Sequence, residues 1–196
     1  MKRNLFLLIL FLSFSAIYSQ NYYMTAPEGY GAAASGGGTA APVTVSTYAD
    51  LIAKLKLTSP QVILISGTIN CSYTSLLVND KTIIGLTGAR LVNTDQTAAG
   101  SGILNLKPGS NNIIIRNLIF EGPGAYDVDG HGNLTSEAAN IWVDHCEFQD
   151  GMDGNFDNKG TADNVTVSWS KFTYLKTPKA GGSGGTDDHR FSDLVG

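Results

Sequence analysis

The sequence has few of the features that mark nucleic-acid-binding, disulfide-rich or membrane-spanning proteins. Its 196 residues carry 13 Lys and Arg against 17 Asp and Glu, with no basic run, so no nucleic-acid partner is expected. Two cysteines, Cys71 and Cys146, are too few for a disulfide framework. One bridge and two buried thiols are both open, and we favour buried thiols. Beyond the N-terminus, no apolar run is long enough to span a bilayer.

The first twenty residues have the pattern of a signal peptide. Lys2 and Arg3 precede the apolar run LFLLILFLSF, and a more polar exit ends at Gln20. Loss of this segment removes two positive charges, so the formal net charge of the chain changes from −4 to −6. We therefore expect a secreted, monomeric protein with no membrane segment in its mature form.

Hairpin turns and crossover helices are also missing. Residues 21–42 form a Gly- and Ala-rich lead-in with the composition of a flexible linker. One amphipathic helix is predicted from Thr47 to about Leu57, because its apolar side chains recur at helical spacing. The rest consists of short apolar runs separated by Gly, Asn, Asp or Ser, without Asn-Gly hairpin turns. This pattern fits a β-sandwich or a doubly wound sheet poorly.

A repeat accounts for these short runs better. Asn112, Asn140 and Asn164 each begin a run whose ninth residue is phenylalanine, and these starts are 28 and 24 residues apart. The phenylalanines are Phe120, Phe148 and Phe172. Such an interval is about the length of one coil of a parallel β-helix. We expect an all-β solenoid domain over residues 43–196, with the early helix capping its first coil.

The stretch from Asn140 to Phe172 contains the most suggestive chemistry. Two β-like runs flank a loop, DGNFD, that holds Asp153 and Asp157. Asp127 and Asp129 follow the preceding coil, and the loops of successive coils stack in a solenoid, so the two pairs are expected to converge. Carboxylates are the ligands that calcium prefers. Ordinary turn aspartates are the alternative interpretation.

Several segments together resemble the pectate lyases of polysaccharide lyase family 1. They include GYGAAASGGG, QVILISGTI, NNIIIRNLIF, NIWVDHCEFQDGMDGNFD and DNVTVSWSKF, in order from about Gly29 to Gly196. The resemblance implies a right-handed parallel β-helix that cleaves polygalacturonate, an acidic polysaccharide, by calcium-dependent β-elimination. It matches the family's calcium-binding carboxylates to Asp153 and Asp157, with a D-x-D element at Asp127 and Asp129. The spacing after Asp129 is about two residues longer than usual, so the choice between Asp127 and Asp129 stays open.

The resemblance implies two basic residues, an arginine base and a lysine at the substrate carboxylate. Lys176 in YLKTPK is our preferred match for the lysine, and Arg190 in DHRFSDLVG is the alternative. The family's arginine-x-proline-x-arginine element follows L-[IV]-G, and no residue of this chain matches the base. We therefore expect a fragment, incomplete at its C-terminus and lacking full catalytic power.

Two other functions remain open on the sequence. One is a non-catalytic β-helix that binds acidic polysaccharide through calcium. The other is a β-helical polygalacturonan hydrolase, which needs paired carboxylates at a defined separation. His145 has no partners at zinc-ligand spacing, so we expect it to be stacked or buried. Arg116, within an apolar run, is expected to be structural.

Overall fold

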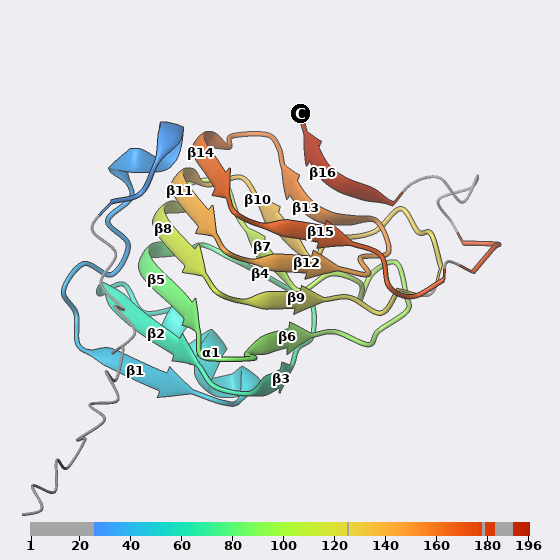
Figure 1. Ribbon diagram of the computed structural model, residues 1–196, viewed down its shortest axis with the longest axis horizontal. Helices are drawn as coiled ribbons and strands as arrows, with labels where there is room; N and C mark the ends of the chain where they lie inside the picture. The colour runs from blue at the N-terminus through green and yellow to red at the C-terminus, as the bar shows by residue number, and fades with distance from the viewer. Residues whose placement is uncertain (1–25, 125, 178, 183–189) are drawn as a thin grey trace, which may run out of the picture.

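The computed structural model describes residues 26–124, 126–177, 179–182 and 190–196, and it is a right-handed parallel β-helix (Figure 1). Three sheets run along its axis, and neighbouring strands of a sheet lie three strands apart in the chain, except the first two, which are consecutive strands joined through the predicted helix. From the second strand onward, each coil therefore contributes one strand to each of the three sheets. All strand pairings among the described residues are parallel, which confirms the expected solenoid.

The three sheets are defined by their strands. Sheet A contains β1 (Pro42–Val45), β2 (Gln61–Ile65), β5 (Asn79–Gly85), β8 (Asn111–Arg116), β11 (Ala139–Asp144) and β14 (Asp163–Ser168). Sheet B contains β3 (Thr68–Asn70), β6 (Arg90–Val92), β9 (Ile119–Glu121), β12 (Glu147–Gln149) and β15 (Lys171–Thr173). Sheet C contains β4 (Thr74–Leu76), β7 (Leu104–Leu106), β10 (Leu134–Ser136), β13 (Gly154–Asn158) and β16 (Phe191–Val195).

The repeat seen in the sequence sets the register of the coils. Phe148 pairs with Phe120 on one side and Phe172 on the other, with ring centroids 4.9 Å and 5.4 Å apart. Ile141 likewise lies between Ile113 and Val165. Parallel strands about 4.8 Å apart bring equivalent side chains into contact, so identical residues stack through the core. The predicted ladder of phenylalanines is confirmed.

The same repeat places asparagines in left-handed backbone. Asn112, Asn140 and Asn164 have φ angles of 60°, 52° and 52°. Asparagine tolerates this region because its short amide can bond locally. A second left-handed position lies at the turn from sheet A to sheet B in each of three coils, where Asn117, His145 and Trp169 hold φ near 50°. These bends redirect the chain from one sheet to the next.

The predicted helix closes the first coil, although it is shorter than expected. α1 (Tyr48–Leu55) begins after Thr47, whose side chain accepts a hydrogen bond from the Asp50 backbone N–H. Leu51 and Leu55 are buried in the core, so the helix covers the open end of the solenoid. Lys81 is also fully buried here, and its Nζ donates to the carbonyls of Leu57 and Ser59 at 2.8 Å and 3.0 Å.

The lead-in, from residue 26 onward, is packed rather than a flexible linker. The 3₁₀ helix η1 (Gly29–Ala33) lies against β11 and β14 (Figure 1), and Ala34 packs with Ile114 and Trp142. A Cβ at Gly31 would lie 2.4 Å from the Ile141 carbonyl oxygen, so only glycine allows this approach. The linker interpretation was therefore wrong for these residues: the small side chains serve close contact with sheet A.

Both cysteines are free thiols, which confirms our preference over a bridge. Cys146 is buried and Cys71 half-buried, and burial raises the pKa of each thiol to about 12. Within the residues that the structure describes, no helix is long and apolar enough to cross a membrane. The predicted signal peptide, residues 1–20, lies outside the described residues.

Candidate functional site

The loops that lead from sheet B to sheet C stack on one edge of the solenoid. The Val128 backbone N–H donates to the Met152 carbonyl at 3.2 Å, and that of Asn133 donates to the Gly154 carbonyl at 3.0 Å. The Gly130 N–H donates to Asp153 Oδ2 at 3.3 Å. The segment after β9 thus lies directly against the segment after β12, and the expected stacking of successive loops is confirmed.

The DGNFD segment is a loop only at its beginning. Gly154–Asn158 forms β13, which pairs with β10 on one side and β16 on the other. Glycine and asparagine disfavour strands, but two flanking ladders of backbone hydrogen bonds outweigh that preference. Interpretation of the whole segment as a turn was therefore wrong: Asp153 precedes the strand, and Asp157 lies within it.

Asp157 is the carboxyl group whose ionisation is most strongly opposed by its surroundings at this edge. Asp157 is 6% exposed, and the pKa of its carboxyl group is raised to about 6. Burial is the largest cause, followed by the charge of Asp153, and Asp193 on β16 adds to it. Lys159 and a hydrogen bond from Thr135 act in the opposite direction. Negative charge is thus concentrated where a cation would be stabilised.

The other two predicted ligands differ from each other in exposure. Asp127 is buried, whereas Asp129 is exposed. Burial raises the pKa of Tyr174, and the charges of Asp157, Asp153 and Asp127 add to that rise. These three aspartates therefore share the neighbourhood of Tyr174. Across the described part of the chain, no three Asp, Glu, His or Cys side chains converge closely enough to form a metal-binding group by themselves.

Lys176 lies at the neighbouring edge of sheet B, engaged with an acidic partner. Its Nζ donates to Glu121 Oε1 at 3.0 Å and to the Gly122 carbonyl at 2.9 Å. Burial alone would raise the pKa of Glu121, but hydrogen bonds and charge from Lys176 and Arg90 hold it below its ordinary value. The side chain of Lys176 is 42% exposed, so this pair remains open to exchange with solvent.

Arg190 lies beside Tyr174 and the segment that precedes Asp153. Its guanidinium covers the ring of Tyr174 at 4.7 Å, and its Nε donates to the Gly151 carbonyl at 3.2 Å. The two terminal nitrogens of Arg190 are buried, and neither has a hydrogen-bond partner among the described residues. The charge of Arg190 lowers the pKa of Tyr174 and the charges of three of the four predicted ligands raise it, so all four side chains lie in the surroundings of that tyrosine.

Sequence reasoning missed two members of this neighbourhood. Asp193 lies on β16, and Tyr174 follows β15. The Leu194–Val195 pair gave only a weak strand signal. Arg116, by contrast, is structural as expected: its Nε donates to Asp144 Oδ2 at 2.8 Å, and its guanidinium lies 5.2 Å from the Trp142 ring centre.

Known proteins match both this sequence and this fold. A family model described as "Pectate lyase" matches residues 8–192. A pectate trisaccharide-lyase of Bacillus licheniformis is 37% identical over 149 residues, which is 69% of this chain and 42% of that protein. A probable pectate lyase B of Aspergillus flavus is 33% identical over 169 residues, 83% of this chain and 44% of that protein.

Among solved structures, one titled "Pectate lyase bound to hexasaccharide" has a TM-score of 0.60 at 18% identity, covering 88% of this chain and 67% of that one. Pectate lyase II of Xanthomonas campestris has a TM-score of 0.56 at 21% identity, covering 87% and 62%. The chain spans less than half the length of the curated relatives named above. On the match over most of its length, this chain belongs to the pectate lyase family.

Proposed function

We propose that this protein cleaves pectate, an acidic polysaccharide, by calcium-dependent β-elimination. The observation that carries the proposal is the acidic edge at β13, where burial, together with the negative charge of Asp153, raises the pKa of Asp157 to about 6. A polyanionic substrate would add to this repulsion. A divalent cation between protein carboxylates and substrate carboxylates removes it.

The donor set fits calcium as a bridging ion. Calcium takes about six to eight oxygen ligands, and Asp153 and Asp157 supply the first of them, with Asp127 or Asp129 as the proposed third contributor. Water and substrate carboxylates would complete the set, which agrees with the absence of a closed three-ligand group among the described residues. When bound, the ion would stabilise charge that develops on the substrate carboxylate.

The basic residues then have separate roles. Arg190 is one candidate to bind a substrate carboxylate: its guanidinium lies over Tyr174 and its terminal nitrogens have no hydrogen-bond partner among the described residues, but both are buried, so its side chain must shift to reach a substrate. Lys176 remains the alternative, since its pair with Glu121 is partly exposed. Stabilising the negative charge that develops when a proton leaves the adjacent carbon lowers the barrier to elimination.

The test is product analysis on polygalacturonate, made with a chain that also carries the arginine base, because no residue of this chain matches it. Elimination leaves a carbon–carbon double bond, so we expect ultraviolet-absorbing oligosaccharides, lost with a chelator and restored by added calcium. Saturated products formed regardless of chelator would overturn the proposal in favour of a hydrolase. Retention of the polysaccharide without any cleavage would favour a non-catalytic binding protein.

We also propose that the protein is exported as a monomer after removal of residues 1–20. The basic start and apolar run that precede Gln20 support this proposal. N-terminal sequencing of protein recovered from the medium should begin near Asn21, and sedimentation should give the mass of one chain. Protein retained in the cell with an intact Met1 would contradict it.

A further inference from the structure

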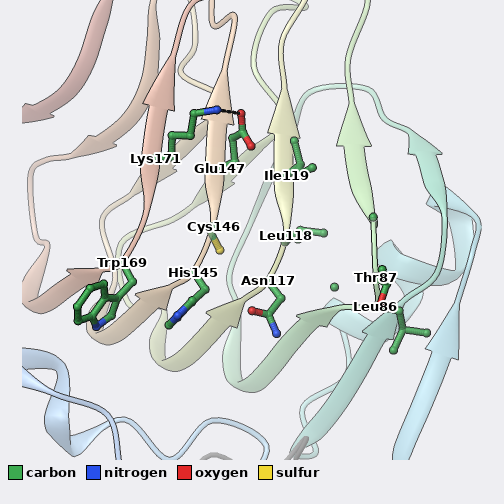
Figure 2. Close-up of a pocket in the computed structure, with 12 residues that line it drawn as sticks. Leu86, Thr87, Asn117, Leu118, Ile119, His145, Cys146, Glu147, Trp169 and Lys171 are labelled. Atoms are coloured by element: carbon green, nitrogen blue, oxygen red, sulfur yellow. Dashed lines mark hydrogen bonds and ion pairs between the residues drawn. The ribbon is translucent and has the colours of Figure 1, made fainter. Parts of the chain in front are cut away.

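An open groove runs along the turns from sheet A to sheet B, on a different edge of the solenoid from the aspartates. It has a volume of about 590 Å³ and crosses the turns of four successive coils. Figure 2 shows Asn117, His145 and Trp169 in a row at equivalent turns, with Lys171 and Glu147 on the adjoining strands. We call this surface the turn groove. The short strands of sheet B separate it from the stacked loops that carry Asp153.

The backbone conformation at Trp169 is energetically unfavourable for a bulky side chain. The φ of 49° lies in the left-handed region, where a bulky side chain is an outlier, and Trp169 is 79% exposed. Asn117, at the same turn two coils away, has the residue type that this conformation favours. The backbone conformation therefore does not favour tryptophan at this turn. Strain on an exposed aromatic side chain points to a binding role.

A contact with Asp144 fixes the orientation of the His145 ring beside Trp169. The ring Nδ1 lies 2.8 Å from Oδ2 of the buried Asp144, and the carboxylate is itself fixed by Ser168 and Arg116. An N–H at Nδ1 leaves Nε2 as the free acceptor on a ring whose side chain is 53% exposed. The rings of His145 and Trp169 lie 6.3 Å apart at 27°. Together the two rings offer a stacking surface, with His145 Nε2 beside it as an oriented hydrogen-bond acceptor.

The charges of the turn groove favour a neutral ligand. Lys171 donates to Glu147 at 2.9 Å, so its one ammonium and one carboxylate neutralise each other. Among the residues that the structure describes, no other Lys, Arg, Asp or Glu lines the groove. An acidic chain would find no unpaired cation on this surface of a negatively charged protein. A sugar ring that presents a face of C–H groups can stack on the indole and hydrogen-bond to the histidine.

We infer that the turn groove is a second, non-catalytic site that binds a neutral hexose polysaccharide along the solenoid axis. The coils repeat every ~4.8 Å, so one chain laid across them meets several turns. β-1,4-Galactan is the chosen probe, because galactose has one face of C–H groups. Polygalacturonate, which differs by a carboxylate on each ring, is its charged counterpart. The inference stands whether or not the acidic edge performs elimination.

The experiment compares retention of the full chain by immobilised galactan. We expect Trp169→Ala to weaken galactan binding by roughly tenfold or more, with cleavage of soluble polygalacturonate unchanged. Tyr30→Ala, which removes an 84% exposed aromatic side chain elsewhere, should leave galactan binding intact. Trp169→Asn separates binding from folding: galactan binding should fall while the melting temperature stays level or rises, because asparagine suits the left-handed turn.

Three results would overturn the inference. Wild-type protein that fails to bind galactan has no such site. Trp169→Ala protein that binds galactan as tightly as wild type excludes the groove. Wild-type protein that sediments as a dimer, and a Trp169→Ala variant that does not, would assign the surface to contact between two copies. Loss of polygalacturonate cleavage, by contrast, bears only on the acidic edge.

Discussion

Asp144 is a buried charge with hydrogen-bond partners on the two neighbouring coils. Asp144 is 2% exposed and accepts hydrogen bonds from Arg116 on β8 and Ser168 on β14. Burial opposes its ionisation, but bonds from Ser168, His145 and Arg116 outweigh that cost and hold its pKa below the ordinary value. The carboxylate therefore joins three neighbouring coils of sheet A through charge-assisted bonds.

Replacement of Asp144 by asparagine should destabilise the protein at neutral pH. The variant leaves Arg116 partly buried without its anion, a change that typically costs about 3 kcal/mol. Because the folded pKa is depressed, the stabilisation is present above the unfolded pKa and is lost as pH falls through the folded value. The difference between wild type and Asp144→Asn in urea unfolding should therefore be large at pH 7 and shrink below about pH 4.

The exposed pair of Lys171 and Glu147 provides the matched control. Its side chains are 61% and 27% exposed, so Glu147→Gln should change the free energy of unfolding by less than about 1 kcal/mol. Equal losses for Glu147→Gln and Asp144→Asn would contradict the view that burial makes the Asp144 network important.

Asp157 should behave in the opposite way to Asp144. Its folded pKa is raised to about 6, so the ionised carboxylate opposes folding at pH 7 when no cation is bound. In the presence of a chelator, Asp157→Asn is expected to raise the free energy of unfolding by about 1–3 kcal/mol. Calcium should raise the melting temperature of wild type and leave that of the variant unchanged.

Asp129→Asn gives the informative comparison in the same thermal assay. This exposed side chain is one of the two alternatives for the third carboxylate. A calcium-induced shift that survives in Asp129→Asn and is lost in Asp127→Asn would assign the ligand to Asp127. If calcium stabilises Asp157→Asn as much as wild type, Asp157 is not a ligand.

At the scale of elements, the lead-in behaves as a strap across the outer face of sheet A. The Gly31 N–H donates to Thr166 Oγ1 at 2.8 Å, and the Ser35 and Gly36 N–H groups both donate to Asn112 Oδ1. These bonds tie the start of the chain to coils more than seventy residues away. The strap thereby covers an apolar patch that includes Trp142.

Gly31→Ala should release this strap. The new Cβ would lie 2.4 Å from a backbone oxygen of β11, a contact that cannot be relieved by turning a side chain. We expect faster protease cleavage within residues 26–42 and a destabilisation of about 1–3 kcal/mol. Ala32→Ser, at the adjacent exposed position, is the control and should show neither effect. Unchanged cleavage in Gly31→Ala would mean that the strap contact adds nothing to stability.

For the molecule as a whole, features that recur in successive coils could be predicted from the sequence, and several features that occur once could not. The phenylalanine ladder was predictable because Phe120, Phe148 and Phe172 recur at one offset from an asparagine, and stacked coils require such recurrence. Strand β13 was not predictable, because Gly154 and Asn155 have low β propensity and the strand forms through its pairing with β10 and β16. The burial of Lys81 also escaped notice, since its partners are carbonyl groups beyond α1 that any sequence provides.

The candidate site follows the same rule. Its aspartates were recognisable as residue types, but their grouping depends on stacked loops of unequal length, and sequence spacing does not fix that. From the sequence, Lys176 was preferred over Arg190 for the basic role. Only the fold shows that Lys176 pairs with Glu121 while Arg190 lies over Tyr174. Asp127 and Asp129 lie on the long loop between β9 and β10, and loops are where repeat patterns give the least information.

The net charge of the chain makes a final prediction about polygalacturonate binding. The protein carries a formal charge of −4, so it should repel a polyanion when no calcium is present. With a chelator, affinity should be low at about 10 mM salt and rise slightly towards 0.1 M, as the Debye length falls from ~30 Å to ~10 Å. With calcium, binding should become tight. Isothermal titration at both salt levels measures this. Tight binding in chelator that weakens as salt is added would show instead that cationic side chains hold the substrate directly, because release of counterions from a polyanion has that signature.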